Sequence, residues 1–314
     1  MPIKFTTAIL LAAAATLSAT HARADDQAPQ TIDEAPDGLE LPGVSATITL
    51  DYVSQYFFRG YEQLDSDSGV VIQPGAEFSI PVIQDDAFSI DATIGTWGSI
   101  HTAGEGWPVT GAPGSGPSNP TSWFEQDVYA SLDLETDTFD LSVGVIHYEF
   151  PNSASNVDTT ELNVRLTLDD SAWFGDFAFN PYVLLAVEMQ NNNVLLGREL
   201  SYLELGGAFE FDFESTDGTP LVLTVPIAVG LSLDDYYLDA SLTEETFGFV
   251  SVGVFCTFPL SEATGSDAWL GAWDLVAGGT VYFLNSDVAG QVDNTDGSGD
   301  NIQFVAQVGI SRTW

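Results

Sequence analysis

The chain has 314 residues, of which 45% are hydrophobic, and it carries 46 acidic side chains against only six lysines and arginines. This shortage of bases excludes nucleic-acid binding, because contacts to phosphate need Lys and Arg. The hydrophobic fraction argues against a disordered chain, while the formal charge of -40 is compatible both with a functional role and with a saline habitat in which acidity keeps proteins dispersed.

The first residues have the three parts of an export signal in order. Lys4 supplies a positive start, residues 8–19 form an apolar stretch too short to span a bilayer, and Ala22-Arg23-Ala24 is a small-residue cleavage site. We therefore expect a signal peptide over residues 1–24. Residues 25–44 combine proline, glycine and acids without periodicity, which predicts a flexible acidic lead-in.

From residue 45 to the end, apolar and polar side chains alternate in about twelve segments. A period of two places one face of each strand in an apolar medium and the other in a wetter one. Residues 45–314 therefore predict a single all-β domain, an antiparallel up-and-down transmembrane β-barrel of about twelve strands, with ten to fourteen left open. The expected strands are 45–58, 69–82, 87–101, 123–135, 138–150, 159–169, 179–190, 200–213, 220–234, 246–259, 268–284 and 301–314.

A soluble β-sandwich would show similar alternation, but two further features favour the membrane barrel. Tight connections such as 136–137 alternate with long polar ones such as 102–122, as periplasmic turns alternate with outer loops. Aromatic residues also gather near strand ends, where a membrane-interface belt requires them. The expected belt comprises Tyr52, Tyr56, Phe57, Phe58, Trp97, Trp123, Phe124, Tyr148, Phe150, Trp173, Tyr182, Trp269 and Trp314.

Residues 47–80 resemble the opening hairpin of a known family. Asp51-Tyr52, Phe58-Arg59-Gly60 and Gln63 match its first strand, with two extra residues near Ser54-Gln55, and the second strand matches loosely at Val71, Gln73 and Gly75. On these residues the chain resembles the TorF-like family of proteobacterial outer-membrane porins. The resemblance implies an outer-membrane barrel with a poorly defined substrate.

The last strand ends on an aromatic residue, as do barrels that the outer-membrane assembly machinery recognises. Trp314 takes the place of the usual Phe, and Arg312 departs from the apolar residue expected two places earlier. The residues expected to form this assembly signal are Phe304, Val308, Ile310 and Trp314.

The polar face of the strands is rich in carboxylates, which would line the lumen and favour cations over anions. We therefore expect a porin-like channel for passive diffusion of small solutes or cations. Glycines on the same face suggest open space, and loop 102–122 is a candidate constriction. The alternative is a closed barrel with a structural or surface-interaction role, because twelve strands enclose a narrow interior. The expected pore-lining residues are Asp51, Glu77, Asp91, Glu125, Asp127, Asp133, Glu161, Arg165, Glu188, Glu204, Glu210, Asp212 and Asp274.

Metal and enzyme signals are weak. Two acidic loops, one with Asp65 and Asp67 and one with Asp293, Asp296 and Asp300, resemble oxygen-rich sites for Ca²⁺ or Mg²⁺; the second has Phe304 where an EF-hand has its glutamate, so it is not an EF-hand. With so few bases, contacts to lipopolysaccharide in the lipid phase would run through divalent cations. His101 and His147 lie in no catalytic motif, so no enzyme is expected. The sequence leaves the oligomeric state open.

Overall fold

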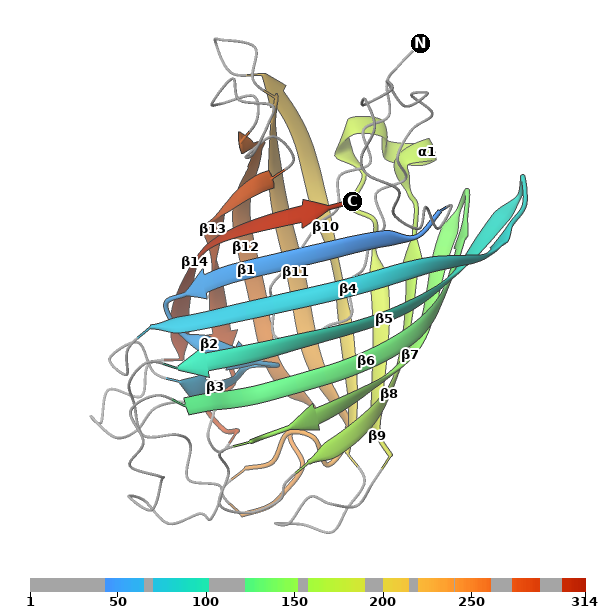
Figure 1. Cartoon of the computed structure of the whole chain (residues 1–314). Coiled ribbons are helices and arrows are strands. Elements are labelled where there is room, and N and C mark those ends of the chain that lie inside the picture. The colour runs from blue at the N-terminus through green and yellow to red at the C-terminus, as the bar shows by residue number, and fades with distance from the viewer. Residues whose placement is uncertain are drawn as a thin grey trace.

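The computed structural model describes residues 43–64, 70–101, 122–151, 158–189, 200–214, 220–239, 241–260, 273–288 and 301–314. Twelve antiparallel strands close into a barrel, which confirms the predicted fold class (Figure 1). The strands in chain order are β1 (Ser45–Val53), β4 (Val71–Gln84), β5 (Phe88–His101), β6 (Ser122–Thr136), β7 (Phe139–Glu149), β8 (Thr159–Leu168), β9 (Tyr182–Glu188), β10 (Ser201–Glu214), β11 (Pro220–Asp234), β12 (Phe247–Pro259), β13 (Trp273–Leu284) and β14 (Ile302–Thr313).

The polar and apolar side chains that alternate along each strand face the inside and the outside of the barrel, respectively. On β6, Val128 and Leu132 are 50% and 57% exposed on the outer face, whereas Asp127 and Ser131, the residues that come just before them, are buried on the inner face. Apolar side chains are exposed on the outer face of most strands, and buried carboxylates, amides and hydroxyls gather inside. This is the inverse of a soluble β-sandwich, in which the apolar faces pack together.

The prediction of one continuous strand over residues 45–58 is wrong. β1 ends at Val53, and the chain then leaves the barrel wall to form a separate two-stranded sheet of β2 (Tyr56–Phe58) and β3 (Tyr61–Leu64). β1 pairs directly with both β14 and β4, so the wall closes without these residues. Figure 1 shows β2 and β3 inside the barrel, at the end away from the C-terminus.

The hydrophobic core lies inside the barrel around this inner hairpin. One buried cluster joins Phe57 of β2 to residues of the wall, among them Tyr202 and Tyr282, and a second joins Tyr56 to Val53 and Val71. Because these side chains meet in the lumen, the hairpin is packed as part of the folded interior.

A short helical segment connects β8 and β9, where α1 (Ser171–Phe174) is followed by the 3-10 turn η2 (Gly175–Phe177). Asp170 fixes the return of the chain, because its carboxylate accepts the backbone N–H groups of Phe179 and Asn180 at 2.9 and 3.0 Å. No helix in the described part of the chain is long and apolar enough to cross a membrane.

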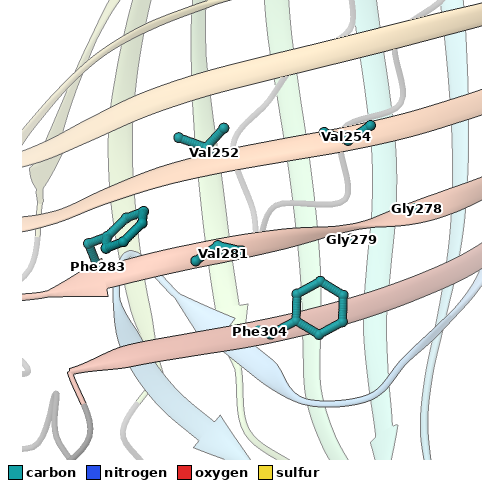
Figure 2. Close-up of a pocket in the computed structure, with 7 residues that line it drawn as sticks. All are labelled: Val252, Val254, Gly278, Gly279, Val281, Phe283 and Phe304. Atoms are coloured by element: carbon teal, nitrogen blue, oxygen red, sulfur yellow. The ribbon is translucent and has the colours of Figure 1, made fainter.

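The outer face of β12, β13 and β14 has an apolar hollow of about 560 Å³ (Figure 2). The paired glycines Gly278 and Gly279 leave room for it, and Phe304 closes one side. Its lining residues are Val252, Val254, Gly278, Gly279, Val281, Phe283 and Phe304. With no charged lining residue and an outward position, this hollow carries no chemistry.

Candidate functional site

The inner hairpin turns through two residues, Arg59 and Gly60, between the paired residues Phe58 and Tyr61. Their φ angles are +49° and +82°, the left-handed pair that a tight two-residue hairpin turn requires. Asn, Asp or Gly normally occupies the first of these positions, because a larger side chain is strained there. An arginine in this conformation suggests that its side chain has a role that offsets the strain.

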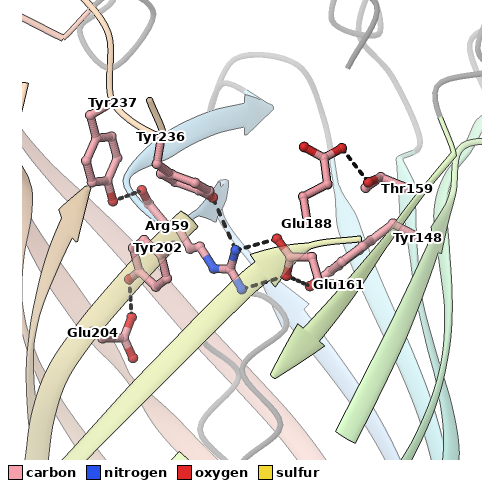
Figure 3. A network of polar contacts seen from close by, with 9 residues as sticks. All are labelled: Arg59, Tyr148, Thr159, Glu161, Glu188, Tyr202, Glu204, Tyr236 and Tyr237. Atoms are coloured by element: carbon pink, nitrogen blue, oxygen red, sulfur yellow. Dashed lines mark hydrogen bonds and ion pairs between the residues drawn. The ribbon is translucent and has the colours of Figure 1, made fainter. Parts of the chain in front are cut away.

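The Arg59 side chain is held in a seat of barrel residues, defined here as Glu161, Tyr148, Tyr202 and Tyr236 (Figure 3). The two terminal nitrogens of Arg59 donate to the two oxygens of Glu161 at 2.8 and 2.9 Å, a fork-to-fork ion pair. The guanidinium also lies 4.4 Å from the ring centroid of Tyr202 and 5.5 Å from that of Tyr236, within cation–π range.

The pairing keeps Arg59 charged inside the protein. Burial alone would lower the pKa of Arg59, but the Glu161 carboxylate opposes this, and the pKa lies well above the ordinary value for arginine. Only about 1% of the Arg59 side chain is exposed, so this cation depends on its partner rather than on water.

Tyrosines fix the seat and the hairpin to each other. The Tyr148 hydroxyl donates to Glu161 at 3.0 Å and orients the carboxylate. The Tyr237 hydroxyl donates to the backbone oxygen of Arg59 at 2.9 Å, and the Tyr61 hydroxyl donates to the backbone oxygen of Tyr236 at 3.0 Å. The hairpin is thereby joined to the wall and to the connection between β11 and β12.

Aromatic contacts hold the first arm of the hairpin on several strands. The Phe57 ring stacks on Tyr282 of β13 at a centroid distance of 5.2 Å, and the Tyr56 ring lies 5.7 Å from Trp97 of β5. The Tyr56 hydroxyl donates to Glu125 of β6 at 2.7 Å. Contacts to β5, β6 and β13 place the hairpin across the lumen.

A second acidic group lies beside the seat. Glu125 and Asp127 occupy successive inward positions on β6 and are 3% and 1% exposed. Neither oxygen of Asp127 accepts a hydrogen bond from the described residues. The carboxylate of Asp127 is close enough to Glu125 and Glu161 for electrostatic repulsion by both. Of these three neighbouring carboxylates, Glu161 is thus neutralised by Arg59, whereas Glu125 and Asp127 are not paired with a base in the described part of the protein.

The structure places all the predicted pore-lining residues on inward positions of their strands, but it groups them unequally. One group lies in the half of the barrel that holds the hairpin and consists of Glu125, Asp127, Glu161, Glu188 and Glu204. Within this group, Glu204 accepts hydrogen bonds from the hydroxyls of Tyr182 and Tyr202.

Elsewhere in the lumen, four of the predicted acids accept hydrogen bonds from neutral side chains. These pairs are Asp51 with Gln307, Glu77 with Tyr129, Asp91 with Gln84, and Asp133 with Ser131 and Ser142. Arg165 packs 3.8 Å from the ring centroid of Tyr182. Glu210 and Asp274 are half-buried on the same inward face, and Asp212, farther along β10, is exposed.

Two sequence-based interpretations of the lumen are wrong. Inward glycines do not mark open space, because aromatic rings cover several of them: a Cβ on Gly95 would meet the Tyr129 ring at 2.2 Å, and one on Gly230 would meet Phe249 at 2.3 Å. Of the residues assigned to a membrane-interface belt, Tyr56, Phe57 and Tyr148 are buried inside, and Trp97 and Tyr182 also contact luminal side chains. Tyr52, Trp123, Trp173 and Trp314 are exposed as that prediction requires.

Several expectations fall outside the described residues, among them the signal peptide, nearly all of the lead-in, Trp269, most of loop 102–122 and the two acidic loops with Asp65, Asp67, Asp293, Asp296 and Asp300. Within the described ranges, no three His, Cys, Asp or Glu side chains are grouped so as to hold a metal ion. His147 is exposed and contacts Thr160 at 3.0 Å, whereas His101 is buried beside Ser99.

Sequence reasoning missed Arg59 as a site residue and missed its tyrosine partners. A local signal was available in the two extra residues at Ser54-Gln55, after which the aromatic run 56–58 meets an Arg-Gly pair. Ser54 now marks the exit from the wall, where its backbone N–H donates to Ala306 at 2.9 Å and its hydroxyl accepts from the N–H of Ala306.

Fold and site together define a class of protein: a closed antiparallel β-barrel with an apolar exterior, a carboxylate-lined interior and an inner hairpin. The chain belongs to the family described as "Bacterial protein of unknown function (Gcw_chp)", whose model matches residues 41–222. This match includes residues 47–80, over which the sequence resembles the TorF-like family; that narrower assignment stays a prediction.

Solved structures with a similar fold are outer-membrane barrels. An outer-membrane channel from Pseudomonas putida F1 has 9% identity and a TM-score of 0.46, over 92% of this chain and 100% of that one. The β-domain of the Bordetella autotransporter BrkA has 11% identity and a TM-score of 0.43, over 86% and 98%. Outer-membrane phospholipase A from Escherichia coli has 12% identity and a TM-score of 0.38, over 85% and 92%. No curated protein matches the sequence.

Proposed function

We propose that the protein is an outer-membrane channel that favours small cationic solutes, with the inner hairpin as its constriction. The location rests on the expected signal peptide and on the apolar side chains exposed around the barrel, which lipid would cover. In this setting the partners are the outer-membrane assembly machinery, acting through Phe304, Val308, Ile310 and Trp314, and the lipid phase, including lipopolysaccharide bridged by divalent cations.

The observation that carries the proposal is the sign of the luminal charge. Carboxylates occupy inward positions on most strands, whereas Arg59 and Arg165 are the inward bases among the described residues. In a narrow lumen with low-dielectric walls, such an excess attracts cations and repels anions.

The inner hairpin sets the width of the passage. Tyr56 and Phe57 reach across to β5, β6 and β13, while Arg59 reaches β8, so the hairpin half of the lumen is largely filled. This packing also favours the second candidate function, a closed barrel with a structural or surface-interaction role. The two functions differ in whether ions pass.

Planar-bilayer recording of the purified protein tests the proposal. Under a KCl gradient we expect stepwise currents and a reversal potential displaced toward the potassium equilibrium value. The double variant Glu125→Gln/Asp127→Asn should bring the reversal potential nearer to zero, because it removes two luminal charges and retains side-chain size. Asp137→Asn, a change at an exposed turn, is the matched control and should leave selectivity unchanged. Membranes that contain folded protein and stay silent would support the closed barrel instead.

A further inference from the structure

The Arg59 seat has the features of a binding site that is already occupied. Its carboxylate and rings belong to the wall and to one connection, since Tyr148 is on β7, Glu161 on β8, Tyr202 on β10 and Tyr236 after β11. None of these residues belongs to the hairpin that supplies the guanidinium. Tyr148, Glu161 and Tyr202 therefore keep their places in the wall when the hairpin is withdrawn, whereas Tyr236 loses the hydrogen bond that its backbone oxygen accepts from Tyr61.

The seat selects for the shape of its occupant. Two parallel hydrogen bonds to one carboxylate require a planar pair of N–H donors, which a guanidinium has and which K⁺ or a quaternary ammonium lacks. Tyr148 holds Glu161 in position from the other side, and the Tyr202 ring lies 4.4 Å from the cation. These contacts discriminate by geometry as well as by charge.

Only the end of the Arg59 side chain is recognised by hydrogen bonds. The two terminal nitrogens pair with Glu161, whereas the inner nitrogen, Nε, is buried and makes no hydrogen bond within the described chain. A guanidinium on a separate small molecule presents the same terminal fork. The attachment to the hairpin adds proximity, but the contacts in the seat do not depend on it.

Removal of Arg59 would leave the Glu161 carboxylate buried without a counter-ion, so that binding of another cation there would be favourable. Glu161 would lose its buried counter-charge next to Asp127, whose oxygens accept no hydrogen bond from described residues. A buried carboxylate without a partner is costly. The turn that presents Arg59 holds a non-glycine residue at φ +49°, so the tethered occupant is bound at some cost in backbone strain.

We infer that the Arg59 seat is a recognition site for the guanidinium group of a solute that enters the lumen, and that Arg59 occupies this site as an internal ligand when the hairpin is closed. The inference deepens the proposed channel function, on which it rests, by naming guanidinium-bearing small cations as the solute class. Binding of such a solute and closure of the hairpin are then mutually exclusive.

The test uses Arg59→Ala, which empties the seat, in bilayers with KCl. Methylguanidinium should reduce the potassium current at a concentration about tenfold or more below that needed for tetramethylammonium, because only the guanidinium can donate two charged hydrogen bonds to Glu161. In Arg59→Ala/Glu161→Gln this preference should disappear. Equal block of Arg59→Ala by the two cations would overturn the inference and leave the channel function intact.

A second measurement serves if Arg59→Ala does not assemble or if no form conducts. Hydrogen exchange of residues 54–64 is then followed in the wild-type protein in detergent, with equal concentrations of the two cations. Methylguanidinium should compete with Arg59 and speed exchange in the hairpin, and tetramethylammonium should not. Identical exchange with both would overturn the inference, whereas absence of current alone would count against the channel function.

Discussion

Replacement of Glu161 by Gln should release the inner hairpin without unfolding the barrel. Gln has nearly the same size and keeps one oxygen to accept from Arg59, but it removes the negative charge that pairs with the guanidinium. Arg59 would then be a buried cation without a counter-charge, supported by the retained Gln oxygen, by the aromatic rings around it and by a 3.4 Å hydrogen bond to the Tyr236 hydroxyl. The hairpin can relieve this by moving toward water, since no wall strand depends on it for pairing.

The size of the effect follows from the burial of the pair. Loss of one partner from a buried ion pair typically costs about 3–5 kcal/mol. The oxygen that Gln retains and the cation–π contacts place the expected cost near the lower limit, about 3 kcal/mol, which is roughly a hundredfold in the closed-to-open ratio.

Hydrogen exchange with mass spectrometry measures that ratio directly. Peptides covering residues 56–64 should exchange roughly a hundredfold faster in Glu161→Gln than in the wild type, whereas β12 and β13 keep their protection. Glu77→Gln is the matched control: Glu77 is a luminal glutamate that accepts a tyrosine hydrogen bond but lies outside the seat. Unchanged protection of the hairpin in Glu161→Gln would refute the view that this ion pair closes it.

Three further predictions concern the wall. Gly95→Ala should lower the free energy of unfolding by about 1–3 kcal/mol, because the new Cβ meets the Tyr129 ring; an unchanged urea midpoint in vesicles would contradict the close packing. Val128→Arg, at the middle of the outer face of β6, should cost about 2–4 kcal/mol in vesicles relative to Val128→Ala, and an equal stability of the two variants would argue against lipid on this face. Trp314→Ala should reduce the amount of assembled barrel in cells several-fold, measured by heat-modifiable migration; normal assembly would remove Trp314 from the expected signal.

The wall of the barrel could be predicted from sequence because its physical cause is local. Each strand alternates between lipid-facing and lumen-facing side chains, and the alternation fixes both the strand and the direction of residues such as Asp127 and Val128. Where the structure describes them, the predicted segments coincide with the observed wall strands within a few residues, apart from the end of the first strand; residues 268–272 of the segment 268–284 lie outside the described residues.

The inner hairpin could not be predicted in the same way. Residues 56–58 continue an aromatic, strand-like run, and period-two alternation does not say whether a strand stays in the wall or turns into the lumen. The Arg59–Glu161 pair joins residues far apart in sequence, so no local pattern specifies it. The same limit explains the glycines, whose covering rings come from neighbouring strands, as Tyr129 does for Gly95.

The direct pairing of β1 with β4 has a consequence for how such proteins can diverge. Val53 and Val71 are partners across the wall, so the chain leaves the sheet after Val53 and rejoins it at Val71, at adjacent points. Insertions, deletions or replacements within this excursion need not disturb the hydrogen-bond ladder of any neighbouring strand. The same barrel wall can therefore carry different inner segments. Proteins that share this wall can then differ in the solutes that they admit.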